Sequence, residues 1–103
     1  MEVSIEDKEL EKLYTSGKSK KLKLPEMVID KFFATIQKIE AAQSIYDLWA
    51  DKGLKFEKLK GTENLYSMRL NRQYRLEMEV TWENVEKTIG LFGLLEISNH
   101  YGD

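Results

Sequence analysis

The hydrophobic pattern changes its period at Gly53, and this change limits the folds that the chain can adopt. Before Gly53, apolar residues recur every three or four positions, which is the spacing of an amphipathic helix. After it, apolar and polar residues alternate, as they do in half-buried strands. A chain of 103 residues has room for a single hydrophobic core. The sequence therefore predicts one α+β domain over residues 1–103, with helices on one side of a mainly antiparallel, twisted sheet of four to five strands.

The first part of the chain predicts a short strand followed by a short helix. Val3 and Ile5 alternate with polar residues and indicate the strand. Asp7 can cap a helix that runs through Ser16, and Gly17 can end it. A basic connector over residues 17–23 follows this helix.

A long amphipathic helix is predicted next. Pro25 suits the first turn of a helix because its φ angle is fixed. The apolar stripe consists of Val28, Ile29, Phe32, Phe33, Ile36, Ile39 and Ile45. Ser44 with Asp47 either continues this helix or begins another, which ends at Gly53.

The remainder of the chain predicts strands. One is expected around Leu54 and Phe56, and two more over residues 65–70 and 74–80. Residues 88–97 are nearly all apolar, which is typical of a strand covered on both faces.

Alternation limits how the two middle strands can pair, because opposed residues lie on the same face. A two-residue loop would pair Arg69 with Tyr74 and so mix polar and apolar residues on both faces of the hairpin. A three-residue loop over 71–73 matches apolar with apolar and polar with polar. The pairs it predicts are Leu70 with Tyr74, Arg69 with Arg75, and Met68 with Leu76.

Two interpretations of the paired arginines stay open at this point. Like charges placed opposite each other cost a few tenths to ~1 kcal/mol. A phosphate would reverse that sign, since each guanidinium offers it a two-pronged fork of donors. Alternatively, Glu77 is a diagonal neighbour of Arg69 and could neutralise it, and a slip of two residues would pair them directly.

Charge is segregated along the chain. The whole chain has a net charge of −2, yet residues 52–75 carry +5 and residues 76–103 carry −5. A local patch is enough to attract a polyanion. Further cations near the arginines are candidates for binding RNA, unless they are only solvated surface: Lys55, Lys58, Lys60 and Arg72.

The end of the chain offers groups that transfer protons. Asn99, His100 and Tyr101 follow the last apolar strand, and an imidazole is the natural acid or base near neutral pH. The alternative is an ordinary surface histidine. RNA supplies its own nucleophile, the 2′-hydroxyl. Its cleavage needs cations on the phosphate and two proton transfers, which His100, Tyr101, Glu57 or a lysine could share.

Several classes of function are excluded or disfavoured. One histidine and no cysteine cannot form a zinc site or a disulfide. There is no Gly-rich phosphate loop and no serine in a nucleophile elbow. No long apolar run or export signal is present, so we expect a cytoplasmic domain with no membrane partner.

Four short segments resemble the HigB branch of the RelE-like toxins, which belong to bacterial type II toxin–antitoxin pairs. The segments are Glu57-Lys-Leu-Lys-Gly61, Tyr66-Ser-Met-Arg-Leu-Asn71, Gln73-Tyr-Arg-Leu76 and Ile97-Ser-Asn-His-Tyr101. The resemblance extends upstream through Asp47-Leu48 and Leu24-Pro25 to the first strand, and so covers nearly the whole chain.

The resemblance implies a RelE-like fold and a ribosome-dependent mRNA endonuclease that needs no metal or other cofactor. Arg69 and Arg75 resemble the phosphate-contacting arginines of the family, and Lys58 and Lys60 resemble its basic residues on the preceding strand. The implied partners are the ribosome, mRNA and a helix-turn-helix antitoxin of the HigA type, with which a toxin forms a hetero-oligomer.

The chain departs from the family pattern in two places. Asn99-His100-Tyr101 stands where an Asp-Tyr-His ending is common. A histidine often found before the Leu-Lys-Gly element is absent, and Lys55 and Glu57 stand nearby, so Glu57 could be the base. Two alternatives remain: a gyrase inhibitor of the ParE type, and a catalytically silent module that only binds an antitoxin.

Overall fold

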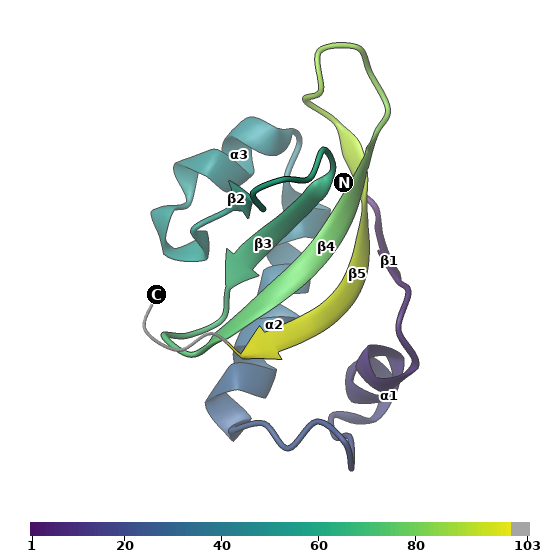
Figure 1. The fold of residues 1–103 in the computed structure, drawn as a ribbon, viewed down its shortest axis with the longest axis vertical. Helices are drawn as coiled ribbons and strands as arrows, with labels where there is room; N and C mark the ends of the chain where they lie inside the picture. The colour runs from purple at the N-terminus through teal and green to yellow at the C-terminus, as the bar shows by residue number, and fades with distance from the viewer. Residues whose placement is uncertain (100–103) are drawn as a thin grey trace.

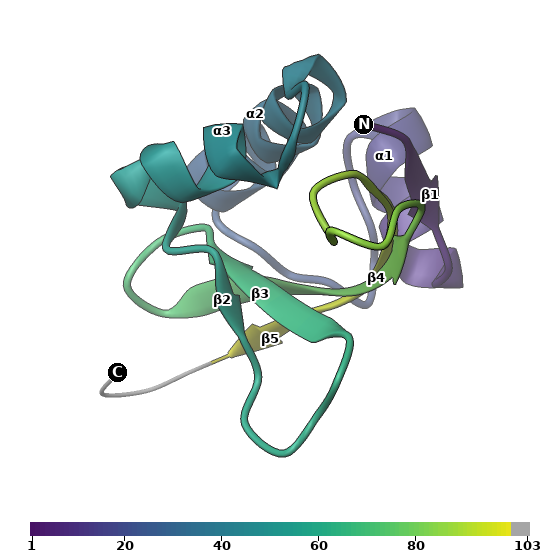
Figure 2. The ribbon, with the colours of Figure 1, turned by 90° about the horizontal axis from the view of Figure 1, so that it is seen from above.

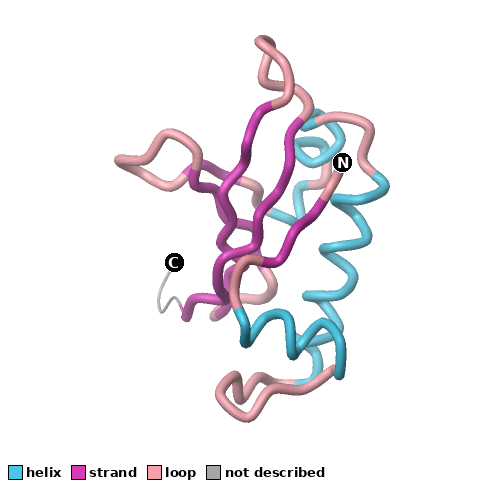
Figure 3. The backbone as a smooth tube through the Cα atoms, turned by 90° about the vertical axis from the view of Figure 1, so that its right-hand side faces the viewer, coloured by secondary structure: helices cyan, strands magenta, loops and turns pink. Residues whose placement is uncertain are grey.

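Three α-helices lie on one face of a five-stranded sheet in the computed structural model, which describes residues 1–99 (Figure 1). The elements are, in chain order, β1 (Val3–Ile5), α1 (Lys8–Ser16), α2 (Glu26–Ala41), α3 (Ile45–Ala50), the 3₁₀ helix η1 (Lys52–Leu54), β2 (Glu57–Lys58), β3 (Leu65–Arg69), β4 (Tyr74–Trp82) and β5 (Gly90–Asn99). Figure 2 shows the sheet beneath α2 and α3, and Figure 3 shows all the helices on one side of the strands. The α+β prediction is confirmed.

The sheet is mainly antiparallel, as predicted. Its strand order is β1-β5-β4-β3-β2, and only the β1–β5 pair among the described strands is parallel. Arg69 lies opposite Arg75 and Met68 opposite Leu76, so the predicted hairpin register is confirmed. The slipped register, which would pair Arg69 with Glu77, does not occur, because Glu77 lies opposite Ser67.

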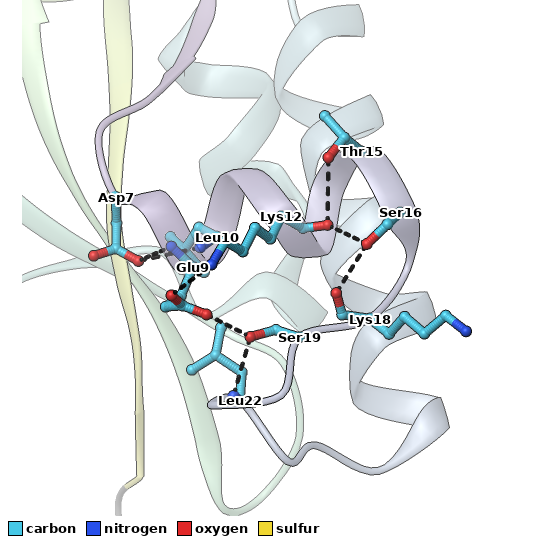
Figure 4. Close-up of polar contacts among 9 residues, drawn as sticks. All are labelled: Asp7, Glu9, Leu10, Lys12, Thr15, Ser16, Lys18, Ser19 and Leu22. Atoms are coloured by element: carbon cyan, nitrogen blue, oxygen red, sulfur yellow. Dashed lines mark hydrogen bonds and ion pairs between the residues drawn. The ribbon is translucent and has the colours of Figure 1, made fainter.

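The predicted ends of the first helix are confirmed, whereas the helix that follows Ser44 ends earlier than predicted. The carboxylate of Asp7 accepts hydrogen bonds from the backbone N–H groups of Glu9 and Leu10, and Gly17 closes α1 in the left-handed conformation (Figure 4). Ser44 begins a new helix rather than continuing the long one, since its Oγ accepts from the backbone N–H of Tyr46. This helix stops at Ala50, and Gly53 lies inside η1 rather than at its end.

The strand predicted around Leu54 and Phe56 is mostly absent. Leu54 ends η1, Lys55 has a φ of 44°, and only Glu57 and Lys58 pair with β3. Asp51 explains the turn, because its carboxylate accepts from the backbone N–H of Gly53 and from Lys38 Nζ. Leu54 and Phe56 are both buried, so the alternating pattern reflects burial rather than strand geometry.

The core lies between the helices and the sheet. The helices contribute Leu10, Leu13, Val28, Phe32, Ile36, Ile39, Ile45 and Leu48, and the sheet contributes Tyr66, Met68, Leu76, Met78, Val80, Phe92 and Leu94. The sequence predicts that the last strand is covered on both faces, and this prediction is wrong for one of the two faces. Phe92 and Leu94 are fully buried beneath the helices, whereas Glu96, on the face that no helix covers, is exposed.

We expect Asp7→Ala to lower the free energy of unfolding by about 1 kcal/mol, because two N–H groups of α1 lose their acceptor. Urea denaturation followed by circular dichroism measures the change. Asp7→Asn is the matched control, since its side-chain oxygen can still accept and most of the stability should remain. Equal losses in the two variants would contradict the capping role.

Candidate functional site

Two rows of polar side chains cross the sheet on the face opposite the helices. The strand registers define them residue by residue. The arginine row consists of Arg69, Arg75 and Ser98. The acidic row beside it consists of Glu57, Ser67, Glu77 and Glu96. No helix covers this face in residues 1–99 (Figure 3), so the registers direct the side chains of both rows away from the helices.

Arg75 is held in place by the acidic row. Its Nη1 lies 2.9 Å from Glu57 Oε1 and donates to Ser67 Oγ at 3.2 Å. The Arg75 side chain is only 12% exposed, whereas that of Glu57 is 57% exposed. Ser67 is buried and belongs to the strand between them. These two contacts therefore hold the guanidinium of Arg75, a residue of β4, in a fixed position against Ser67 of β3 and Glu57 of β2.

Arg69 has a different environment. It is half-buried, and no side chain within residues 1–99 forms an ion pair or hydrogen bond with its guanidinium. Glu77 remains diagonal to Arg69 across β3 and β4, as expected, but the two form no ion pair within residues 1–99. The acid that pairs with an arginine here is Glu57, and the arginine is Arg75.

Glu77 and Glu96 form a pair of carboxyl groups across β4 and β5. Partial burial raises the pKa of Glu96 above its ordinary value, and the charge of Glu77 and a hydrogen bond with it raise it further. Asp7 adds a smaller contribution of the same sign. Glu96 therefore retains its proton more readily than an isolated glutamate would.

An aromatic cluster fixes the edge of the sheet that carries Glu57. The buried ring of Phe56 lies 4.7 Å from the ring of Trp49 and 5.0 Å from that of Tyr66, measured between centroids. Successive side chains of an extended chain point to opposite faces. Burial of Phe56 therefore directs Glu57 towards the outer face, where it meets Arg75.

The other cations proposed for RNA binding do not join either row. Lys58 is exposed and lies opposite Tyr66, on the side of the sheet that the helices cover. Lys55 and Lys60 are exposed in the segments on either side of β2, and Arg72 is exposed in the β3–β4 loop. These four cations therefore lie outside the arginine row and the acidic row.

The C-terminal candidates are only partly described. Asn99 ends β5 opposite Tyr74, which places it on the alternate face from Arg75. His100 and Tyr101 lie outside the described residues.

Sequence reasoning missed three members of the rows. Ser67 could have been identified, since it alternates with Arg69 on the same strand. Glu96 and Ser98 could not, because an irregularity in the β4–β5 register between Glu77 and Met78 shifts the alternation of β5. Ser98 Oγ is buried and has no hydrogen-bond partner within the described residues.

The described part of the chain contains neither a metal site nor a membrane-spanning helix. Within residues 1–99, no three histidine, cysteine, aspartate or glutamate side chains come close enough together to hold a metal ion. None of the helices in the same range combines the length and apolar character needed to cross a bilayer.

Comparison with known proteins identifies the family. Residues 3–89 match the family described as RelE-like toxin of type II toxin-antitoxin system HigB. Toxin HigB-1 of Vibrio cholerae serotype O1 (strain ATCC 39315 / El Tor Inaba N16961) is 35% identical over 77 residues, which are 74% of this chain and 80% of the relative.

A solved structure agrees at the level of the fold. The YoeB/ParE toxin from Agrobacterium tumefaciens matches 98% of this chain and 100% of its own, with a TM-score of 0.51 and 15% sequence identity. The RelE-like fold is thereby confirmed. Since the family covers residues from β1 to the end of the β4–β5 loop, including both arginines, the chain belongs to the HigB family of RelE-like toxins of type II toxin–antitoxin systems.

Proposed function

We propose that this toxin is a ribosome-dependent mRNA endonuclease that cleaves by attack of the RNA 2′-hydroxyl on the adjacent phosphate. The observation that carries the proposal is the Arg69–Arg75 pair on the uncovered face, where one guanidinium is fixed and the other has no partner within residues 1–99. Like charges in this arrangement favour a shared anion. Membership of a toxin–antitoxin family implies an antitoxin partner, for which we propose a helix-turn-helix protein of the HigA type.

The two arginines suit different tasks. Arg75 cannot swing away without losing Glu57 and Ser67, so it offers a preorganised donor to the phosphate. Arg69 is free to form a two-pronged contact with the non-bridging oxygens. Together they would stabilise the extra negative charge of the five-coordinate transition state.

The cleavage needs two proton transfers, one to a base and one from an acid. Glu57 is an exposed carboxylate beside Arg75, which supports its assignment as the base that accepts the proton of the 2′-hydroxyl as that oxygen bonds to phosphorus. The bond from phosphorus to the 5′-oxygen breaks, and the leaving oxygen needs a proton. We assign its donor to His100 or Tyr101 on chemical grounds. The products are a 2′,3′-cyclic phosphate and a 5′-hydroxyl.

We expect Arg69→Ala and Arg75→Ala each to slow message cleavage by about a hundredfold or more, equivalent to roughly 2–4 kcal/mol of lost transition-state stabilisation. Primer extension of message on programmed ribosomes measures the rate. Lys87→Ala, which removes an exposed cation from the β4–β5 loop, is the matched control and should stay near the parent rate.

Two results would refute the nuclease. One is full toxicity of both arginine variants in growing cells. The other is an intact message alongside inhibition of DNA gyrase in a supercoiling assay with the parent toxin, which would place the protein with the gyrase inhibitors.

A second prediction separates two roles of Glu57. If Glu57 is the base, Glu57→Gln should lose at least about a hundredfold in rate. A glutamine can still accept a hydrogen bond from the Arg75 guanidinium, so a purely positioning role predicts near-parent activity for Glu57→Gln and a loss only in Glu57→Ala. Single-turnover cleavage rates of the two variants distinguish the two roles.

A third prediction concerns the charge of the acidic row. Because the folded state raises the pKa of Glu96, it binds this proton more tightly than the unfolded chain, and stability falls as pH rises through the two values. Above them, Glu96→Gln should therefore stabilise the protein by a few tenths of a kcal/mol. The gain should fade below pH 4.5, the ordinary pKa, as the wild-type carboxyl becomes protonated in both states.

Urea denaturation at pH 7 and pH 3.5 measures the effect of Glu96→Gln. Glu79→Gln, an exposed carboxylate on β4 outside both rows, is the control. An identical response of the two variants at both pH values would contradict the coupling between Glu77 and Glu96.

A further inference from the structure

A second basic surface lies away from the arginine row, on the connector between α1 and α2. We call residues 16–23, together with Lys12 of α1, the lysine connector. Its cations are Lys12, Lys18, Lys20, Lys21 and Lys23, and residues 8–23 carry a net charge of +4. The connector bounds an open hollow of about 700 Å³ whose lining is Glu9, Lys12, Ser16, Lys18, Ser19, Lys20 and Lys21.

Hydrogen bonds fold this connector back against α1. Ser16 Oγ donates to the carbonyl of Lys18 at 2.9 Å, and Ser19 Oγ donates to Glu9 Oε1 at 2.8 Å. The backbone N–H of Leu22 in turn donates to Ser19 Oγ (Figure 4). The path of the lysines is therefore set by contacts to α1 rather than left to a free loop.

The one carboxylate that lines the hollow is already engaged. Glu9 accepts from Ser19 and pairs with Lys12 at 3.4 Å, and the hydrogen bond from Ser19 is the main reason that its pKa lies below the ordinary value. Lys18, Lys20 and Lys21 form no ion pair within residues 1–99. The hollow thus presents several uncompensated positive charges to solvent.

The chemistry of the lining selects the kind of partner. Ammonium groups on flexible stems contact phosphates as point charges and do not read bases. The lining contains no aromatic ring on which a single-stranded base could stack, and no apolar side chain that could enter a membrane. These features fit the phosphate backbone of a folded RNA.

Position connects this surface to the arginine row. The connector and the β3–β4 hairpin lie towards the same, lower end of the molecule in Figure 1. A large RNA could therefore contact both. We propose that the lysine connector binds the phosphate backbone of structured ribosomal RNA while the arginine row engages the message. This inference rests on the proposed function for the identity of its partner.

The test compares Lys18→Gln/Lys20→Gln/Lys21→Gln with the charge-matched control Lys31→Gln/Lys52→Gln/Lys87→Gln. Binding to purified bacterial ribosomes is measured by co-sedimentation at a series of KCl concentrations. Each lost phosphate contact should reduce the slope of log affinity against log salt by about 0.7–0.9. The slope of the connector variant, which loses three lysines, should therefore fall by about 2.1–2.7, and that of the control by much less. Cleavage of message at saturating ribosome concentration should stay within about twofold of the parent for both.

A neutral variant tests the geometry of the fold-back. Ser19→Ala removes two hydrogen bonds of the connector without changing its charge. It should weaken ribosome binding several-fold while retaining most of the salt slope, and circular dichroism should confirm an intact fold.

The other outcomes separate failure of the connector inference from failure of the proposed function. Equal salt slopes for the connector variant and the parent would overturn the inference and leave the nuclease intact. Loss of antitoxin co-purification with unchanged ribosome binding would also overturn it and assign the surface to a protein. A parent toxin that binds ribosomes but never cleaves message would refute the proposed function alone, since the connector is judged by binding.

Discussion

The register of the β3–β4 hairpin is the constraint on which the outer face depends. Asn71 Oδ1 accepts from the backbone N–H groups of Gln73 and Tyr74, at 2.8 and 2.7 Å, and the N–H of Leu70 donates to the carbonyl of Tyr74. A slip of one residue would turn one of the two strands over, burying its arginine and exposing either Met68 or Leu76, both of which are now fully buried. Burial of a large apolar side chain is worth about 1.5–3 kcal/mol. The hydrophobic core therefore directs the arginines outward without any contact between them.

Placing two guanidiniums opposite each other has a cost, and β2 offsets it. Its two residues contribute little to the sheet as hydrogen-bonded partners, but they bring Glu57 beside Arg75. The pair is charge-assisted and half-screened by solvent, so its net contribution to stability is modest. Its effect on geometry is larger, because Ser67 and Glu57 fix one cation and leave Arg69 available. The aromatic contacts of Phe56 hold this edge in place.

Much of this arrangement could be predicted from alternation alone, and the exceptions have physical causes. The pairing of Arg69 with Arg75 follows from the apolar residues that flank them. The strand predicted at Leu54 fails because Asp51 favours a 3₁₀ turn, which buries the same residues by another path. Glu96 and Ser98 reach the outer face through a register shift in β5 that no local pattern reports. The fold-back of the lysine connector depends on Ser19 meeting Glu9, ten residues earlier in the chain, which sequence spacing does not reveal.

The distribution of charge gives a physical reason for the dependence on the ribosome that we propose. The arginine row lies directly beside four positions of the acidic row, so free RNA approaching it meets both signs of charge. Arg75 is already committed to Glu57, and a single phosphate contact must compete with that pair. A site of this kind binds isolated RNA weakly. A second contact through the lysine connector adds affinity only when one body of RNA spans both surfaces, because linked sites raise the effective concentration of the second interaction. A folded ribosomal RNA with a message held close to it meets this condition, whereas a short free RNA does not. Selection of the substrate can then follow from the distance between two modest binding surfaces, with no base-specific contact at either.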